Sequence, residues 1–386
     1  MRSKRLLDKN GKYDFLVKLI LLIVLFFSFS LILKPLFYNN FPDFTSYYYA
    51  AYTFMEKGNP YLDRGKDFGL FLYPPPSLFL FIFLSFLPLS VAGKVFTGIS
   101  IFCLIFSLYL LFKIVKIGPF SNLGMFLLII AFNFFPTKFT LGMGQINNFV
   151  LLAVILFIYF YVKDEYVYSG LFISLASILK VWPLLLLLIP FLERNRKTLL
   201  SFFVFSFSLL ILSFPFLGEE IYLYYFSNTL PNLFSSVALA YYNQSLPGFI
   251  NELLGNGQFF IFIKYIFYIV LLLPIIYFCK FNRMNYMFKL LFFGFLSNFS
   301  ILVVNNSWKH HFVWMLIPLF SVVEYLREEV NDFRYYLFLF LSYFLMTLNF
   351  KNSVNLPLLL KHHALWGALI FYLLTFRLLL NERIKV

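Results

Sequence analysis

Long apolar runs recur along the whole chain and are separated by short clusters of basic residues. Several of these runs are long enough for a helix to cross a bilayer core of about 30 Å, where a helix leaves no backbone group unpaired. Hydrophobic residues make up 61% of the 386 residues and charged residues only 12%. This balance does not fit a single soluble core. We therefore expect an all-α, polytopic transmembrane helical bundle.

The basic residues outnumber the acidic ones, 31 against 17, for a formal net charge of +14. They lie between the apolar runs and not on one polar face, which argues against a nucleic-acid partner. The positive-inside rule places these clusters in the cytoplasm. They span 2–12, 113–116, 194–197, 280–289, 327–334 and 383–385. Cys103 and Cys279 are far apart in apolar surroundings, so the sequence indicates neither a disulfide nor a metal site.

With the basic clusters inside, we expect about twelve helices (11 to 13) and two cytoplasmic termini. The first span lacks a small-residue cleavage site after it and is expected to be a retained anchor. The predicted spans are 15–37, 92–112, 120–135, 148–162, 167–179, 181–193, 198–216, 259–278, 287–304, 312–325, 335–350 and 364–380. The stretch 77–89 follows a run of three prolines, and we expect it to be a short helix in the outer leaflet.

One integral-membrane domain is expected over 1–386, with the motifs in 1–325 and helices that complete the bundle in 326–386. The first outer loop, 38–91, carries an aromatic-rich stretch from Tyr47 to Phe54 that suits an interfacial helix. This topology also brings the unusual polar groups to one side of the membrane. They are Asp43, the run 144–148, Lys180, the run 243–245 and the run 308–311. Polar groups at membrane depth are costly unless they face a cavity or a partner, so we expect a shared outward-facing cavity.

Asp43 follows Pro42 and precedes a helical run, so it can act as a helix N-cap. It can also act as a general base at the membrane surface, where partial burial raises a carboxyl pKa toward the working range. Lys180 marks a tight hairpin tip before Trp182 and Pro183. Its two interpretations are a lysine that extends to the lipid headgroups and a fixed cation for a lipid phosphate.

His310 and His311 are neighbours and point about 100° apart on a helix, which counts against one metal held by both. Either can donate a hydrogen bond to a phosphate or assist proton transfer, and either can be a simple interfacial histidine beside Trp308. His362 and His363 form a second pair that we expect at a solvated loop end. Solvation is also expected for Arg64, Lys66 and Asp67.

Neutral side chains with several hydrogen-bonding groups are suited to hold sugar hydroxyls. Gln145, Asn147, Asn243, Gln244 and Ser245 are of this kind. The alternative is helix capping, by Asn148 and by Ser245.

Taken in chain order, these groups form a series of short motifs. The motifs are Asp43-Phe44 with Tyr48, Ala50 and Ala51, then Gly58-Asn59-Pro60-Tyr61, Tyr73-Pro74-Pro75, Gly144-Gln145-Ile146-Asn147, Gly170 leading to Lys180-Val181-Trp182-Pro183, Asn243-Gln244-Ser245-Leu246 and Ser307-Trp308-Lys309-His310-His311. The series resembles glycosyltransferase family 87 of the GT-C superfamily over residues 10–325.

The resemblance implies an inverting hexosyltransferase that moves a sugar, usually mannose, from a polyprenyl-phosphate carrier to a hydroxyl of a membrane glycolipid or glycan. Arabinofuranose is the sugar in related enzymes. It implies that Asp43 is the general base, and that Lys180 and His310 or His311 stabilise the departing phosphate. Gln145, Asn147, Asn243, Gln244, Tyr73 and Trp308 are then expected to bind sugar or acceptor.

The implied location is the outer side of the cytoplasmic membrane, with the lipid bilayer and the lipid-linked donor as partners. The few acids near Asp43 fit a mechanism without a metal or other cofactor, and a divalent cation held by the donor phosphate stays open. Two alternatives are a transporter or flippase and a ligase or polymerase that uses an oligosaccharide on a diphosphate lipid. The first would place its polar groups near the bilayer midplane, whereas those of this chain lie at the outer ends of spans.

Overall fold

The computed structural model describes residues 2–62, 69–281, 284–330, 332–350 and 356–384, and every regular element in this part of the chain is helical. The α-helices are α1 (Arg2–Leu33), α2 (Pro42–Met55), α3 (Phe79–Ser85), α4 (Leu89–Ile114), α5 (Asn122–Asn133), α6 (Phe135–Met143), α7 (Asn147–Val162), α8 (Tyr166–Leu179), α9 (Leu188–Leu192), α10 (Arg196–Leu217), α11 (Glu219–Tyr224), α12 (Leu230–Ser235), α13 (Leu246–Leu254), α14 (Gln258–Phe278), α15 (Tyr286–Val303), α16 (Leu316–Glu329), α17 (Phe333–Thr347), α18 (Leu358–Lys361) and α19 (His363–Ile384). Short 3-10 segments are η1 (Lys34–Phe37), η2 (Pro75–Leu78), η3 (Trp182–Leu187) and η5 (Lys309–Met315), and η4 (Tyr225–Thr229) is one turn of π-helix.

The all-α, multi-pass prediction is confirmed. Six helical stretches of the described chain are long and apolar enough to cross a membrane: Tyr13–Phe37, Leu89–Ile114, Arg196–Leu217, Gln258–Phe278, Tyr286–Val303 and His363–Arg383. The bent pair α5 and α6 makes a seventh if it is counted as one crossing. Several other predicted spans are helices of 10–17 residues, short of the roughly 20 that a straight crossing needs. The predicted number of about twelve full crossings is therefore not reached by helix length alone.

Capping side chains set many of the helix starts. Asn195 accepts a hydrogen bond from the Thr198 amide at α10, and Asn285 accepts one from the Phe288 amide at α15. Ser245 does the same for the Gly248 amide at α13, which confirms the capping interpretation of this residue. Between α5 and α6 the chain bends by 48° just before Pro136, as expected where a proline interrupts the helical hydrogen bonds.

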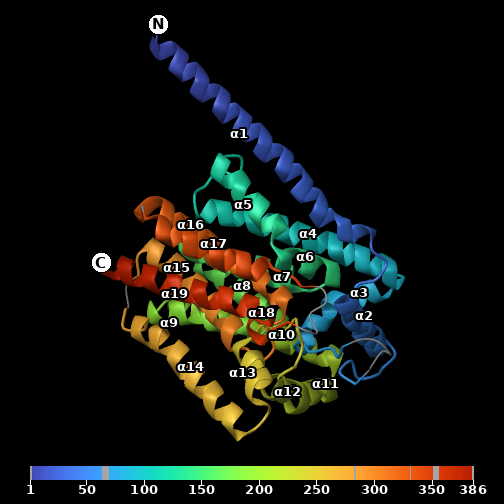
Figure 1. The fold of residues 1–386 in the computed structure, drawn as a ribbon. Helices are drawn as coiled ribbons and strands as arrows, with labels where there is room; N and C mark the ends of the chain where they lie inside the picture. The colour runs from blue at the N-terminus through green and yellow to red at the C-terminus, as the bar shows by residue number, and fades with distance from the viewer. Residues whose placement is uncertain (1, 63–68, 282–283, 331, 351–355, 385–386) are drawn as a thin grey trace.

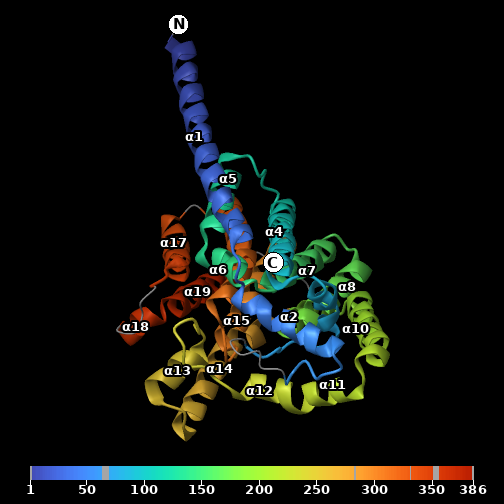
Figure 2. The same ribbon diagram turned by 90° about the vertical axis from the view of Figure 1, so that its right-hand side faces the viewer.

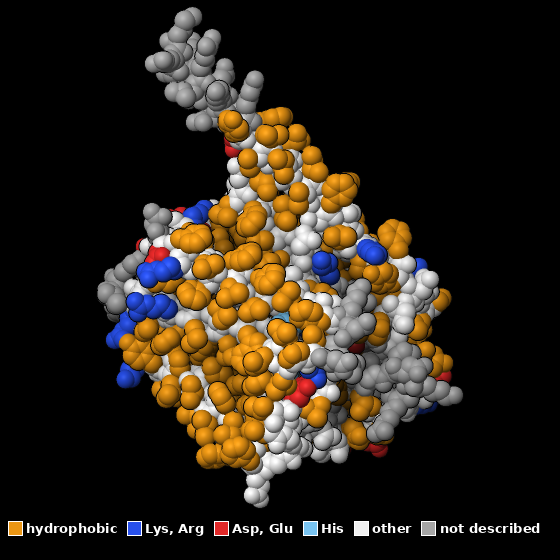
Figure 3. Space-filling view, viewed as in Figure 1, with side chains coloured by type: hydrophobic (Ala, Val, Ile, Leu, Met, Phe, Trp, Pro, Cys, Tyr) orange, Lys and Arg blue, Asp and Glu red, His pale blue; other side chains and the backbone are white. Residues whose placement is uncertain are grey.

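Figures 1 and 2 show the helices packed into one body, from which the N-terminal part of α1 projects. The second half of α1 packs along α5, where the Asn133 amide donates to the Ser28 hydroxyl at 2.7 Å. In the C-terminal region the Asn298 amide of α15 donates to the carbonyl of Ala368 in α19 at 3.0 Å. Such polar bonds between apolar helices fix their register inside a bilayer. Figure 3 shows apolar side chains over most of one face, with Lys and Arg gathered mainly near the end of α19.

Gly144 ends α6 in the left-handed conformation, at φ +69°. A Cβ at this position would lie 2.7 Å from the Cβ of Phe44, in the first turn of α2. Only glycine therefore allows the α6–α7 turn to approach α2 so closely.

We expect Gly144→Ala to cost about 1–2 kcal/mol in backbone strain alone and to displace Phe44, and with it the neighbouring Asp43. Gly255→Ala is the control: Gly255 also has a positive φ, +74°, but a Cβ added there would meet no atom within 4 Å. Thermal unfolding in detergent should show a loss of stability in both variants. Activity per folded molecule should fall only in Gly144→Ala. Equal activities in the two variants would show that the close approach of Gly144 to Phe44 does not position Asp43.

Candidate functional site

Four other chain segments lie around Asp43. This residue lies in the first turn of α2, but Phe41 is the N-cap and no side chain caps the helix. The N-cap interpretation of Asp43 is therefore wrong, because Pro42 starts the helix and moves Asp43 one position inside it. The carboxylate turns instead toward the α6–α7 turn, where its Oδ2 accepts a hydrogen bond from Gln145 Nε2 at 2.8 Å.

The Asp43 side chain is partly exposed. Its exposed fraction is 29%, and no donor among the described residues binds its other carboxylate oxygen. Burial raises the pKa of Asp43, while the hydrogen bond from Gln145 and the charge of Lys180 oppose that rise. The group is therefore a partly shielded carboxylate with one free oxygen, as a general base requires.

Gln145 is buried and uses both ends of its amide. Its Oε1 accepts a hydrogen bond from the hydroxyl of Tyr47 at 2.9 Å and a longer one from that of Tyr73 at 3.4 Å. The two tyrosine hydroxyls also contact each other at 2.8 Å. Gln145, Tyr47 and Tyr73 thus form one hydrogen-bonded group with Asp43.

Lys180 has an extended backbone conformation and lies between α8 and η3, as the hairpin prediction expects. Its Nζ is 2.8 Å from His311 Nε2 and lies over the rings of Tyr73 and Trp314, at 5.7 and 5.2 Å from their centroids. The lysine is thus held in the cluster by His311, Tyr73 and Trp314. Burial lowers the pKa of Lys180 to about 7, and the charge of Asp43 opposes this shift.

His310 belongs to the same cluster. Its Nδ1 lies 3.8 Å from Asp43 Oδ2 and has no hydrogen-bond partner among the described residues. Burial and the charge of Lys180 lower the pKa of His310 well below its ordinary value, so the imidazole is neutral and the contact with Asp43 is not an ion pair. His311 is also neutral for the same two reasons, and it stacks on Trp314 at 5.0 Å between ring centroids.

One further predicted residue, Asn147, supports this segment from behind, together with Thr140. Asn147 is fully buried at the start of α7, and its amide donates to the carbonyl of His310 at 3.1 Å. Thr140 of α6 donates to the same carbonyl at 3.0 Å. Asn148 does not cap α7 as expected: it donates across to the hydroxyl of Ser100 in α4 at 3.0 Å, because the helix already begins at Asn147.

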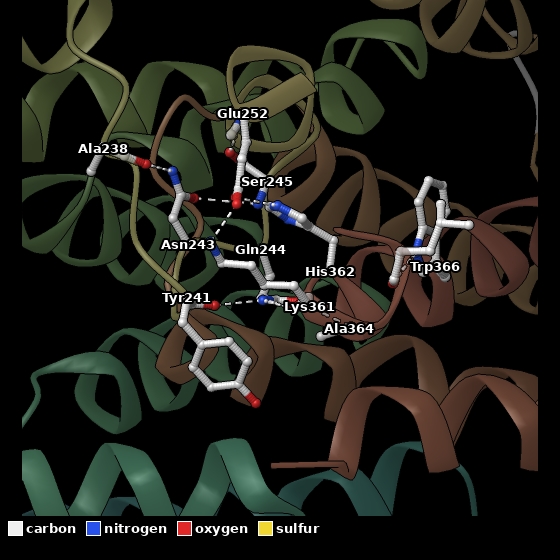
Figure 4. A network of polar contacts seen from close by, with 12 residues as sticks. Ala238, Tyr241, Asn243, Gln244, Ser245, Glu252, Lys361, His362, Ala364 and Trp366 are labelled. Atoms are coloured by element: carbon white, nitrogen blue, oxygen red, sulfur yellow. Dashed lines mark hydrogen bonds and ion pairs between the residues drawn. The ribbon is translucent and has the colours of Figure 1, made fainter. Parts of the chain in front are cut away.

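Asn243 and Gln244 lie in a different network (Figure 4). Both are buried, and both ends of each amide bond to protein groups. Asn243 accepts from the Ser307 amide at 3.0 Å, and its backbone forms an isolated bridge with Trp308. Gln244 donates to the carbonyl of Lys361 at 2.9 Å and accepts from the Ala364 amide at 3.0 Å. In this arrangement they hold the segment that leads to His310, and sugar binding by them stays a prediction.

Two predicted sugar-binding residues keep exposed surface. Tyr73 and Trp308 are both half-buried, and Tyr73 faces Lys180 as described above. Aromatic side chains with one open face are suited to pack against a sugar ring or an apolar chain. These two therefore stay candidates for contact with donor or acceptor.

A second buried lysine, Lys309, lies next to His310 in sequence and faces the other way. Its Nζ contacts His363 Nε2 at 2.9 Å and donates to the hydroxyl of Tyr241 at 2.6 Å. Burial lowers the pKa of Lys309 to about 7. His362 and His363 are each 1% exposed, so the prediction of a solvated pair is wrong. The reason is that Glu252 and Lys309 provide partners inside the protein, with His362 Nε2 3.0 Å from a carboxylate oxygen of Glu252.

Sequence reasoning missed Tyr47, which is 2% exposed although it was assigned to an interfacial stretch. Its spacing contains the missing signal: Asp43 and Tyr47 are four residues apart on one helix and so share a face. Trp314 was missed as well, and it contacts both Lys180 and His311. The residues Arg64, Lys66 and Asp67 lie outside the described residues.

These features define a multi-pass helical membrane protein with a carboxylate, a lysine and two neutral histidines gathered at the ends of several helices. The chain matches the model of glycosyltransferase family 87 over residues 71–305, more than half of its length, and it belongs to this family. It is therefore a membrane glycosyltransferase.

The chain is also similar to curated proteins named alpha-(1->3)-arabinofuranosyltransferase from two strains of Mycobacterium tuberculosis, CDC 1551 / Oshkosh and ATCC 25618 / H37Rv. The identity is 27% over 195 residues, which is 49% of this chain and 42% of each relative. The match thus spans less than half of the length of these relatives.

Proposed function

We propose that this glycosyltransferase moves a sugar from a polyprenyl-phosphate carrier to a hydroxyl of a glycolipid or glycan, with inversion, on the outer side of the cytoplasmic membrane. The observation that carries the proposal is the joint placement of Asp43 and Lys180 in one cluster. A base and a cation are the two groups that such a transfer needs at its opposite ends.

In the proposed reaction, Asp43 takes the proton of the acceptor hydroxyl while the oxygen of that hydroxyl forms a bond to the anomeric carbon of the sugar. The bond between that carbon and the phosphate oxygen breaks, and its electron pair leaves with the lipid phosphate. Lys180 stabilises the negative charge of this phosphate, and His310 or His311 donates a hydrogen bond to it. Tyr73 and Trp308 contact the sugar or the acceptor. No step uses a metal ion.

Mannose is the sugar that we propose first. Arabinofuranose is the second candidate, because the curated relatives are named as arabinofuranosyltransferases. A glycan ligase or polymerase would need a sugar on a diphosphate lipid instead, so the identity of the donor separates these functions.

The test is a transfer assay in membranes that contain the protein, with labelled polyprenyl-phosphate mannose, polyprenyl-phosphate arabinofuranose and a diphosphate-linked oligosaccharide in parallel. We expect label on endogenous lipid or glycan from a monophosphate donor, both with and without EDTA. Membranes without the protein are the control. Label from the diphosphate donor alone, or from none of the three, would contradict the proposal.

A further inference from the structure

Gln145 makes its contacts with protein groups, and this distinguishes it from a sugar ligand. It is 7% exposed, and the amide is shared between Asp43 on one side and the hydroxyls of Tyr47 and Tyr73 on the other. We propose that Gln145 is a positioning residue for Asp43, oriented by Tyr47 and Tyr73, and that it sets the protonation range of the base. This inference rests on the proposed role of Asp43 as general base.

The orientation of the amide follows from its two sets of neighbours. An ionised carboxylate accepts hydrogen bonds and cannot donate one, so the amide group that faces Asp43 must be the NH₂. The amide oxygen must then face the tyrosines, each of which can donate a hydroxyl proton. The reverse orientation would place Gln145 Oε1 against Asp43 Oδ2. Tyr47 therefore favours the one orientation in which Gln145 stabilises ionised Asp43.

Packing holds each member of this group in place. Tyr47 follows Asp43 by one helical turn in α2, and its ring lies 4.7 Å from that of Phe81 and 5.2 Å from that of Tyr73, between centroids. The backbone amide of Gln145 donates to the carbonyl of Thr140 at 2.9 Å. Two ends of the hydrogen-bonded chain are thus fixed by α2 and α6, and little freedom is left for the amide between them. Such a preorganised partner is what a catalytic group needs to keep one geometry.

The charged and titratable groups around Asp43 determine the direction of the effect. Lys180 favours the ionised carboxylate, while burial disfavours it. His310, at 3.8 Å, is neutral, and burial raises the pKa values of Tyr47 and Tyr73, so these three carry no charge in the working range. Burial raises the pKa of Asp43, and the Gln145 hydrogen bond and the charge of Lys180 both lower it. Loss of the Gln145 bond should therefore raise the pKa of Asp43. The base acts in its ionised form. When the pH is lowered, the variant should therefore lose activity at a higher pH than the wild type does.

The test compares Gln145→Met, which keeps the length of the side chain but removes the amide, with Tyr47→Phe, which keeps the ring. The readout is the pH dependence of kcat/KM for transfer. For Gln145→Met we expect the acidic limb to move up by about one pH unit, so that transfer on that limb falls about tenfold. At its pH optimum, Gln145→Met should transfer sugar nearly as fast as the wild type. Tyr47→Phe should move the limb in the same direction by less, because Gln145 keeps Asp43 within reach.

Tyr343→Phe is the matched control, since it removes a hydroxyl that donates to the Ile130 carbonyl at 3.0 Å, away from Asp43. Its limb should not move. A raised KM at every pH with an unmoved limb in both Gln145→Met and Tyr47→Phe would overturn the inference in favour of sugar binding. If Gln145→Met fails to fold, Tyr47→Phe alone decides between these outcomes. Asp43→Asn with full activity would instead refute the proposed function itself.

Discussion

Asp43→Asn is expected to lower transfer by about 10²–10⁴-fold, the contribution that a positioned general base makes. Asparagine has the same shape and can still accept a hydrogen bond from Gln145, so the helix start and the surrounding packing should stay intact. The loss should appear in kcat and not mainly in KM, because the base acts on the acceptor hydroxyl during the chemical step. Steady-state kinetics in membranes, normalised to the amount of folded protein, measure it.

Glu252→Gln provides the control for Asp43→Asn. Glu252 is also a partly exposed carboxylate with a lysine and a histidine beside it, Lys361 and His362, but it lies in the separate network of Figure 4. We expect this variant to retain the pH profile and most of the activity. An Asp43→Asn protein that transfers as fast as the wild type would remove Asp43 from the mechanism.

Lys180→Met is expected to lower transfer by about 10²–10³-fold, the cost of losing one preorganised group that stabilises developing negative charge. The pH dependence provides a second test. Because burial lowers the pKa of Lys180 to about 7, the free enzyme loses this positive charge as the pH rises above about 7. We therefore expect an alkaline limb in kcat/KM near that pH. In kcat the limb should lie at higher pH, because a bound phosphate favours the charged lysine.

Lys180→Arg should keep the charge at every accessible pH, so the alkaline limb should disappear while part of the activity stays. Lys309→Met is the matched control, because Lys309 is also buried, also contacts a histidine and has a pKa that burial lowers to about 7. This variant should keep the alkaline limb even if it is less stable. If the alkaline limb disappears in Lys309→Met and stays in the Lys180 variants, the roles proposed for the two lysines must be exchanged.

The helices themselves could largely be predicted from the sequence. The predicted spans 198–216 and 259–278 compare with Arg196–Leu217 and Gln258–Phe278 in the structure, because long apolar runs with polar ends define a membrane helix well. The convergence of Asp43, Gln145, Lys180 and His310 was also predictable. It followed from the placement of basic clusters, which are independent of these four residues.

The directions of the polar side chains were less accessible. Asp43 meets Gln145 directly after the left-handed turn at Gly144, and the backbone of the buried Asn243 is bridged to that of Trp308. Such turns depend on contacts between distant segments, which helical periodicity does not contain. The bend between α5 and α6 is of the same kind, since Pro136 permits it but only tertiary packing selects its angle.

The opposite orientations of Lys309 and His310 connect the C-terminal helices to the cluster around Asp43. Lys309 binds His363 at the start of α19, and His310, the next residue, lies beside Asp43. One peptide bond joins Lys309 and His310, so their side chains leave neighbouring points of the backbone. A displacement at the start of α19 therefore acts directly on the residue that precedes His310. The position of His310 beside Asp43 is thus coupled, through Lys309, to helices that carry none of the family motifs.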